Sequence, residues 1–168
     1  MADLVSKEDV FFDNPSKTVD AVLEFLSDKA VELGAASDRE AVLASFRERE
    51  AQGSTGMVGG FALPHAKSAA IERTSVMVVK FSGEVDWKSM DGEPIKAAIA
   101  IFTPTDPQGG VHLAVLAKIA SMLMQPDFCS TILGSDDAEA IADAINERRA
   151  DARARAGPGP GTVERSTR

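Results

Sequence analysis

Two nearly continuous apolar segments constrain the folds that this chain can adopt. Residues 75–81 read SVMVVKF and residues 95–102 read IKAAIAIF. A strand with one face in water alternates apolar and polar side chains, whereas these two segments are apolar at almost every position. Both strands are therefore expected to be covered by helices on both faces, and this predicts an α/β sandwich.

Segments that could form these helices lie before and after the two strands. Their apolar side chains recur at the spacing of a helix, and serine, proline and glycine residues mark the expected ends. The pattern predicts a short strand at 10–13 and helices that start at Ser16, at Ser37 with capping-box spacing, after 109–110, at Pro126 and at Ser135.

Composition narrows the class of protein. The net charge of −8 disfavours nucleic acid and anionic membranes as partners, because both bind clustered Lys and Arg. A single cysteine, Cys129, excludes an internal disulfide and suits a reducing compartment. The acidic N-terminal sequence carries no apolar signal core, so we expect a cytoplasmic protein.

The last part of the chain differs in composition from the rest. Residues 150–168 contain the run Gly157-Pro158-Gly159-Pro160-Gly161 and few apolar side chains. Such a segment has too little apolar surface to pack as a core. We therefore expect one domain over residues 1–149, followed at 150–168 by a disordered tail or an inter-domain linker.

The chain has two histidines, and the first lies in a distinctive stretch. His65 follows Pro64 and a glycine pair, so a short strand is expected to present the imidazole at its end. An imidazole that is partly neutral near neutral pH can act as a base, a ligand or a nucleophile. The second histidine, His112, precedes Val115 by three residues, which predicts that it lies in the first turn of a helix on the inward side.

Charged residues continue the apolar stripe of the helix after Ser37. Three and four residues beyond Phe46 the stripe reaches Arg49 and Glu50, at positions where core residues are expected. Either the helix has reached the edge of the domain and both side chains are solvated, or they serve a site. The glycine-rich loop 52–60 follows and could bind phosphate through its N–H groups, although it lacks the ending of a Walker loop.

Taken together, these fragments resemble a known family. Arg49-Glu50, Ser54-Thr55-Gly56, residues 61–65 (FALPH) and His112-Leu113 resemble the enzyme IIA domain of the fructose–mannitol (type 2) family of the phosphoenolpyruvate-dependent sugar phosphotransferase system. The resemblance covers about residues 8–147 and implies a mixed central β-sheet with helices packed on both faces. Ala66 departs from the pattern, because the family commonly has glycine after the histidine.

The resemblance implies a phosphotransferase that works through a phosphohistidine. His65 would accept the phosphoryl group from the histidine-containing phosphocarrier protein and pass it to a cysteine of an enzyme IIB domain, for uptake of a sugar such as fructose. Arg49 and His112 would support it, with Thr55 as a further candidate. No cofactor or metal is implied, because the transfer runs between side chains.

Four other interpretations of the residues stay open. A nitrogen-related regulatory paralogue of the same fold would be phosphorylated likewise but would signal by binding a target. A pure interaction domain would leave His65 unmodified. Cys129 could carry covalent chemistry, although its apolar surroundings favour a packing role. A metal site of His65, His112 and a carboxylate would join two histidines far apart in the sequence, and the chain has no third histidine and no paired cysteines.

Overall fold

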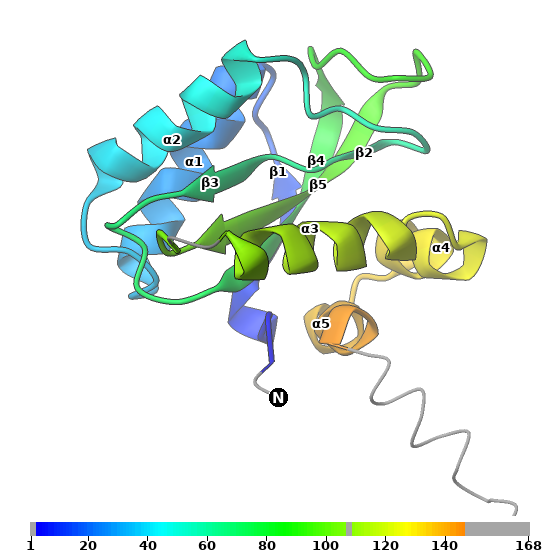
Figure 1. The fold of residues 1–168 in the computed structure, drawn as a ribbon. Helices are drawn as coiled ribbons and strands as arrows, with labels where there is room; N and C mark the ends of the chain where they lie inside the picture. The colour runs from blue at the N-terminus through cyan, green and yellow to red at the C-terminus, as the bar shows by residue number, and fades with distance from the viewer. Residues whose placement is uncertain (1–2, 107–108, 147–168) are drawn as a thin grey trace, which may run out of the picture.

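The computed structural model describes residues 3–106 and 109–146, which form a single α/β unit (Figure 1). In chain order the elements are a 3-10 helix (Lys7–Asp9), β1 (Val10–Asn14), α1 (Val19–Glu32), α2 (Arg39–Ala51), β2 (Phe61–Ala62), β3 (His65–Lys67), β4 (Ser75–Val85), β5 (Ile95–Thr103), α3 (Gly110–Met122), α4 (Pro126–Gly134) and α5 (Ala138–Asn146).

The sheet is mixed, as the family resemblance implied. Its strands run in the order β1-β4-β5-β2, and β3 also pairs with β5. β4 and β5 are antiparallel, whereas β1 pairs with β4, and β2 and β3 pair with β5, in parallel. The two apolar segments are therefore the central pair of strands, where both faces and both edges are covered.

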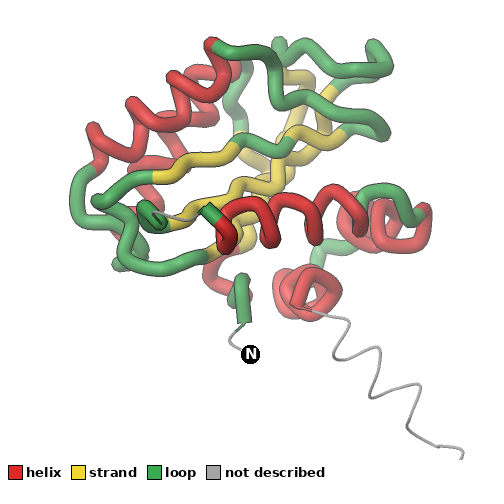
Figure 2. The backbone as a smooth tube through the Cα atoms, viewed as in Figure 1, coloured by secondary structure: helices red, strands yellow, loops and turns green. Residues whose placement is uncertain are grey.

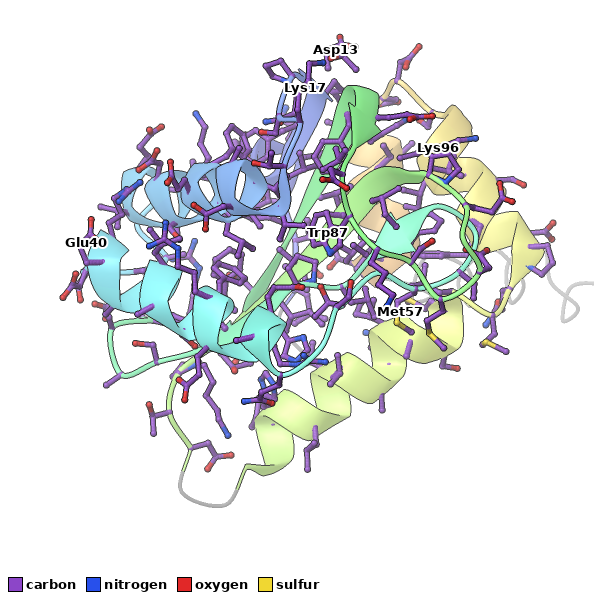
Figure 3. The ribbon with its side chains drawn as sticks, turned by 90° about the horizontal axis from the view of Figure 1, so that it is seen from above. Asp13, Lys17, Glu40, Met57, Trp87 and Lys96 are labelled. Atoms are coloured by element: carbon purple, nitrogen blue, oxygen red, sulfur yellow. The ribbon has the colours of Figure 1, made fainter. Side chains whose placement is uncertain are left out.

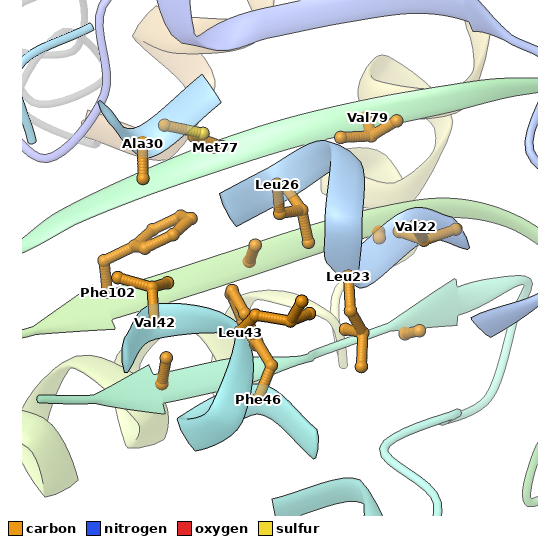
Figure 4. Packing of buried hydrophobic residues seen from close by; sticks show 14 of the residues in the cluster. Val22, Leu23, Leu26, Ala30, Val42, Leu43, Phe46, Met77, Val79 and Phe102 are labelled. Atoms are coloured by element: carbon orange, nitrogen blue, oxygen red, sulfur yellow. The ribbon is translucent and has the colours of Figure 1, made fainter. Parts of the chain in front are cut away.

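Helices cover both faces of this central pair, which confirms the prediction from its apolar sequence. One face packs against α1 and α2 (Figure 4), and the other against α3, α4 and α5. Successive residues of a strand point to opposite faces. In β4, Met77 and Val79 accordingly belong to the first core, and Val76 and Val78 to the second.

Some predicted ends of these elements were wrong by a few residues. The side chains that accept the first helical N–H groups belong to Thr18, Asp38 and Asp137. The sequence had pointed instead to Ser16, Ser37 and Ser135, which lie one or two residues earlier. β4 runs beyond residue 81, because Val85 pairs with Ile95 and both side chains are buried. A local sequence pattern does not reveal such cross-strand pairing.

β2 and β3 form one interrupted edge strand. Both pair with β5, and the interruption contains Pro64, which has no N–H to donate (Figure 2). The Pro64 carbonyl still accepts a hydrogen bond from the Ile101 N–H at 3.0 Å, so the strand stays on β5. His65 thereby lies opposite Ile101 at the start of β3.

The only tryptophan of the chain lies in one of the two loops next to this edge. Trp87 is 6% exposed and belongs to the core that contains α1 and α2 (Figure 3). Met57, on the loop after α2, accepts a hydrogen bond at its carbonyl from the Met90 N–H at 3.1 Å. We call residues 52–60 and 86–94 the paired loops.

Among the residues that the structure describes, no helix is long and apolar enough to span a bilayer.

The end of α5 fastens the N-terminal segment to the domain. The Asn146 side chain accepts hydrogen bonds from the N–H groups of Leu4 at 2.9 Å and Val5 at 3.2 Å, and donates to the Val5 carbonyl at 2.8 Å. The Leu4 carbonyl in turn accepts from the Val76 N–H of β4. One amide side chain therefore acts as a pairing partner for the backbone of residues 4 and 5.

We expect Asn146→Ala to lower the free energy of unfolding by about 1–3 kcal/mol, since three hydrogen bonds are lost at a half-buried position. Urea unfolding would measure the change. A chain that ends at residue 149 keeps Asn146 and serves as the control, with unchanged stability expected. The tail that the sequence predicts at 150–168 lies outside the described residues. Equal stability of Asn146→Ala and the parent would contradict this role.

Candidate functional site

The hydrogen bonds of His65 determine its tautomer. Its Nδ1 lies 2.9 Å from the Leu63 carbonyl oxygen, which can only accept, so Nδ1 carries the proton. Its Nε2 lies 3.1 Å from Nε of Arg49, which can only donate, so Nε2 carries a lone pair. Both contacts require the same neutral tautomer, and Nε2 is its nucleophilic atom.

The surroundings of His65 favour the neutral ring. Burial lowers its pKa below the usual value, and the positive charge of Arg49 lowers it further. The hydrogen bond to Leu63 and the charge of Glu50 act in the opposite direction, but the net shift is downward. At neutral pH the imidazole is therefore uncharged, as a nucleophile needs to be.

Arg49 reaches this site from the last turn of α2. The side chain is half-buried; its Nε donates to His65, and its Nη1 donates to the Gly53 carbonyl at 2.7 Å. Of the two interpretations of the charged pair after Phe46, the structure supports a place in a site over a solvated helix end. Both side chains at the end of the stripe make contacts within the protein: Arg49 donates to His65 and Glu50 accepts from Thr55 in the loop.

His112 lies beside His65, in the first turn of α3 as the sequence predicts. The two ring centroids are 5.2 Å apart, with the planes at 52°. Nδ1 of His112 lies 2.7 Å from the Thr103 hydroxyl, which is buried at the end of β5. Within the described ranges no hydrogen bond joins the two imidazoles, so Thr103 is the group that orients His112.

The two histidines are neighbours in space although 47 positions apart in the sequence. Their distance in the sequence was therefore a wrong argument against a shared metal site. Nevertheless, over residues 3–106 and 109–146 no group of three or more His, Cys, Asp or Glu side chains is placed to hold a metal ion. Arg49 contacts Nε2 of His65, and the ring of His112 lies beside the ring of His65.

The glycine-rich loop is folded on itself. The amides of Gly53, Thr55, Gly56, Met57 and Gly59 all donate to acceptors within the protein. The Thr55 hydroxyl and amide both donate to Glu50, and the side chain is 2% exposed. In this structure Thr55 and these five amides are thus occupied, and the donor that contacts His65 Nε2 belongs to Arg49.

Cys129 lies away from this chemistry, on α4. Its Sγ–H donates to the Leu123 carbonyl at 3.3 Å, and the half-buried side chain packs on the core beneath α3 and α4. Burial raises the pKa of the thiol, so the nucleophilic thiolate is disfavoured. These contacts fit the packing role that the sequence favours.

The sequence did not single out Thr103 or Leu63, and it did not reveal that Glu50 binds Thr55. Thr103 and Leu63 act through contacts that the sheet creates between distant segments, and no spacing in the sequence reveals them. Glu50 did leave a signal, because it occupies a core position of the helix stripe.

The neutral imidazoles give the fold a dependence on pH. Burial lowers the pKa of His112 as well, assisted by the positive charge of Lys67 and by that of His65 once its own ring is protonated. As pH falls below about 6.5, the unfolded chain takes up protons that the folded protein resists. We therefore expect the free energy of unfolding to decrease as pH falls below this value, down to the lowered pKa values of the folded protein.

Urea unfolding between about pH 7.5 and 5.5 would measure this slope. His112→Gln keeps a hydrogen-bonding side chain beside Thr103 and removes one titrating group. It should reduce the loss of stability with falling pH. An unchanged slope in the variant would contradict a contribution of His112.

Comparison with known proteins identifies the family. Residues 3–148 match the model of the family described as "Phosphoenolpyruvate-dependent sugar phosphotransferase system, EIIA 2". The chain is 31% identical over 138 residues to the "PTS system fructose-specific EIIA component" of Haloferax volcanii, covering 82% of this chain and 89% of the relative. It is also 31% identical over 141 residues to the "Nitrogen regulatory protein" of Bradyrhizobium diazoefficiens, covering 84% and 91%.

Solved structures share the fold. The nitrogen regulatory protein IIA-Ntr of Neisseria meningitidis superposes with a TM-score of 0.76 at 22% identity, over 85% of this chain and 96% of that one. Enzyme IIA for mannitol of Escherichia coli, in its complex with phosphorylated enzyme IIB, gives a TM-score of 0.70 at 14% identity, over 84% and 96%. The family match spans nearly all the described residues, and the chain therefore belongs to the EIIA type 2 family of the phosphoenolpyruvate-dependent sugar phosphotransferase system.

Proposed function

We propose that Nε2 of His65 accepts a phosphoryl group from the phosphohistidine of the histidine-containing phosphocarrier protein and passes it to a cysteine of an enzyme IIB domain. The observation that carries this proposal is the tautomer of His65. Its proton is held on Nδ1 by Leu63, and its lone pair on Nε2 points at an arginine instead of at the core.

In the first transfer, the Nε2 lone pair attacks phosphorus. A bond forms between Nε2 and phosphorus, and the bond from phosphorus to the donor's ring nitrogen breaks, with its electron pair returning to the donor. His65 keeps its proton on Nδ1 throughout, so no base is needed. The phosphorylated ring becomes cationic, and the Leu63 carbonyl stabilises its N–H.

In the second transfer, a thiolate of the enzyme IIB partner attacks the same phosphorus. The bond from phosphorus to Nε2 breaks, and its electron pair restores the neutral imidazole. The site then returns to its starting state, with Nε2 again accepting from Arg49. Both steps exchange one phosphorus bond for another and require no added oxidant or reductant.

Arg49 covers Nε2 in the free protein, so its guanidinium must release this nitrogen before attack. Its fork of N–H groups matches two phosphoryl oxygens and can bind them once the group has arrived. The N-terminal end of α3 adds a favourable dipole, because His112 in its first turn lies beside His65. His112 supplies a neutral polar ring next to the group.

The destination of the phosphoryl group has two candidates. The relative from Haloferax volcanii is named as fructose-specific, which supports sugar uptake through an enzyme IIB domain. The relatives from Bradyrhizobium diazoefficiens and Neisseria meningitidis are named as nitrogen regulatory proteins, which supports a regulatory role in which phosphorylation controls binding to a target. Both functions use the same phosphohistidine.

Phosphorylation by phosphoenolpyruvate, enzyme I and the carrier protein tests the proposal. We expect one acid-labile, base-stable phosphoramidate at His65, lost in His65→Gln and kept in His112→Gln. Addition of enzyme IIB domains then separates the two destinations: rapid discharge to a fructose enzyme IIB supports uptake, and retention of the phosphoryl group with every enzyme IIB supports regulation. Phosphate mapped to His112 or Cys129 would overturn the assignment.

A further inference from the structure

Glu50 contacts the glycine-rich loop next to Arg49. Its carboxylate accepts the Thr55 N–H at 3.2 Å and also accepts the Thr55 hydroxyl. Thr55 is 2% exposed, so these two donors are shielded from water and depend on the carboxylate. Glu50 therefore fixes both the backbone and the side chain of Thr55.

A path of hydrogen bonds leads from Thr55 to the reacting ring. The Thr55 carbonyl accepts the Leu63 N–H at 3.0 Å. The Leu63 carbonyl then accepts the Nδ1–H of His65 at 2.9 Å. The position of the carbonyl that holds the imidazole proton thus depends on the strand segment that Thr55 holds.

Arg49 contacts the other nitrogen of the His65 ring. It donates to Nε2 of His65 at 3.1 Å, and it is the residue directly before Glu50. Two consecutive residues of one helix turn therefore control the two nitrogens of His65, Arg49 directly and Glu50 through Thr55 and Leu63.

The place of Glu50 in its helix argues against a contribution to helix stability alone. Glu50 lies in the last turn of α2, where the negative end of the helix dipole disfavours a carboxylate. It is also half-buried at the end of an apolar stripe. A residue that breaks two local rules at once is expected to serve a site.

We propose that Glu50 is a positioning residue for phosphoryl transfer, which keeps the proton of His65 on Nδ1 and the lone pair on Nε2. This inference rests on the proposed function of His65 as the phosphoryl acceptor. The chemical consequence is direct, because a His65 ring with its proton on Nε2 has no electron pair there to attack phosphorus. Glu50 contacts neither the ring nor the phosphoryl group and acts only through its neighbours.

The tautomer can be measured without any phosphoryl transfer. In long-range ¹H–¹⁵N spectra of the unphosphorylated protein, we expect Nδ1 of His65 to show the shift of a protonated nitrogen and Nε2 that of an unprotonated one. In Glu50→Ala the two shifts should move toward each other as both tautomers become populated. The rate of transfer from the phosphorylated carrier protein should fall about tenfold or more, as expected on loss of a hydrogen bond to a charged group.

Three further variants make the test specific. Glu50→Gln retains one acceptor oxygen and should recover part of both properties. Thr55→Val keeps the shape and the amide but removes the hydroxyl. It should change the ¹⁵N shifts and the transfer rate in the same direction as Glu50→Ala, by less, and it replaces Glu50→Ala in the test if that variant does not fold. Glu48→Ala removes an exposed carboxylate from the same helix and should change neither.

The outcomes separate this inference from the proposed function. A folded Glu50→Ala protein, or Thr55→Val in its place, with the parent's ¹⁵N shifts and transfer rate would overturn the positioning role. If His65 of the parent is never phosphorylated, the proposed function fails, while the ¹⁵N shifts still decide whether Glu50 sets the tautomer.

Discussion

Arg49→Lys is expected to slow phosphoryl transfer at His65 by about 10- to 100-fold while leaving the fold intact. A hydrogen bond to a charged group contributes about 1.5–3 kcal/mol, and each 1.4 kcal/mol corresponds to about tenfold in rate. Arg49 contacts His65 Nε2 through Nε and the Gly53 carbonyl through Nη1 at the same time. An ammonium on a flexible chain cannot reproduce this planar fork, or its match to two phosphoryl oxygens.

Single-turnover transfer from the phosphorylated carrier protein, and onward to an enzyme IIB domain, would measure the effect. Arg47→Lys is the matched control, because Arg47 lies on the same helix, is exposed and pairs with Asp20 and Glu24 away from the site. Parent rates in both directions for Arg49→Lys would mean that a positive charge alone suffices and that the guanidinium geometry has no role.

The architecture could be predicted from the sequence because its physical causes are local. The apolar runs at 75–81 and 95–102 require cover on both faces, and this requirement holds wherever the helices come from. The stripes of α1 and α2 and the Pro-His stretch are likewise contained in short segments. Such local patterns are sufficient to indicate the fold class and to single out His65.

The site could be predicted only in part, because its geometry arises where distant segments meet. The edge strand brings His65 to the end of β5, where Thr103 also holds His112. No spacing in the sequence predicts that the ring centroids of His65 and His112, from different segments, lie 5.2 Å apart. In the loop that could bind phosphate, the amides of Thr55 and Gly59 instead donate to Glu50 and Asp91, acceptors that the local sequence does not reveal.

Gly56→Ala is expected to be strongly disruptive, for a reason that the loop sequence alone does not show. A Cβ atom at Gly56 would lie 2.1 Å from the carbonyl oxygen of Lys88, 2.9 Å from its carbonyl carbon and 3.0 Å from Cα of Ser89. All three are backbone atoms, so no side chain can move aside. Glycine is required here because the paired loops approach each other so closely.

Alanine must separate the paired loops, and the consequences should reach both stability and the site. Next to Gly56, the Ser54 hydroxyl donates to the Lys88 carbonyl, and Thr55 holds Glu50. Overpacking of this kind costs about 1–3 kcal/mol. We expect a loss of this size in urea unfolding, together with slower phosphoryl transfer to His65 as Thr55 and Leu63 shift.

The fluorescence of Trp87 provides an independent measurement, because this single tryptophan is buried directly before Lys88. Its emission should move to longer wavelength in Gly56→Ala as the paired loops part and water reaches the ring. Gly134→Ala is the control: a Cβ there meets no atom within 4 Å and its φ is not positive. Its emission should match the parent, and its stability should be equal or higher by up to about 1 kcal/mol, because alanine restricts the unfolded chain. An unchanged Trp87 spectrum and parent stability in Gly56→Ala would show that the loops yield easily, and the contact between them would then have no part in holding Thr55 in place.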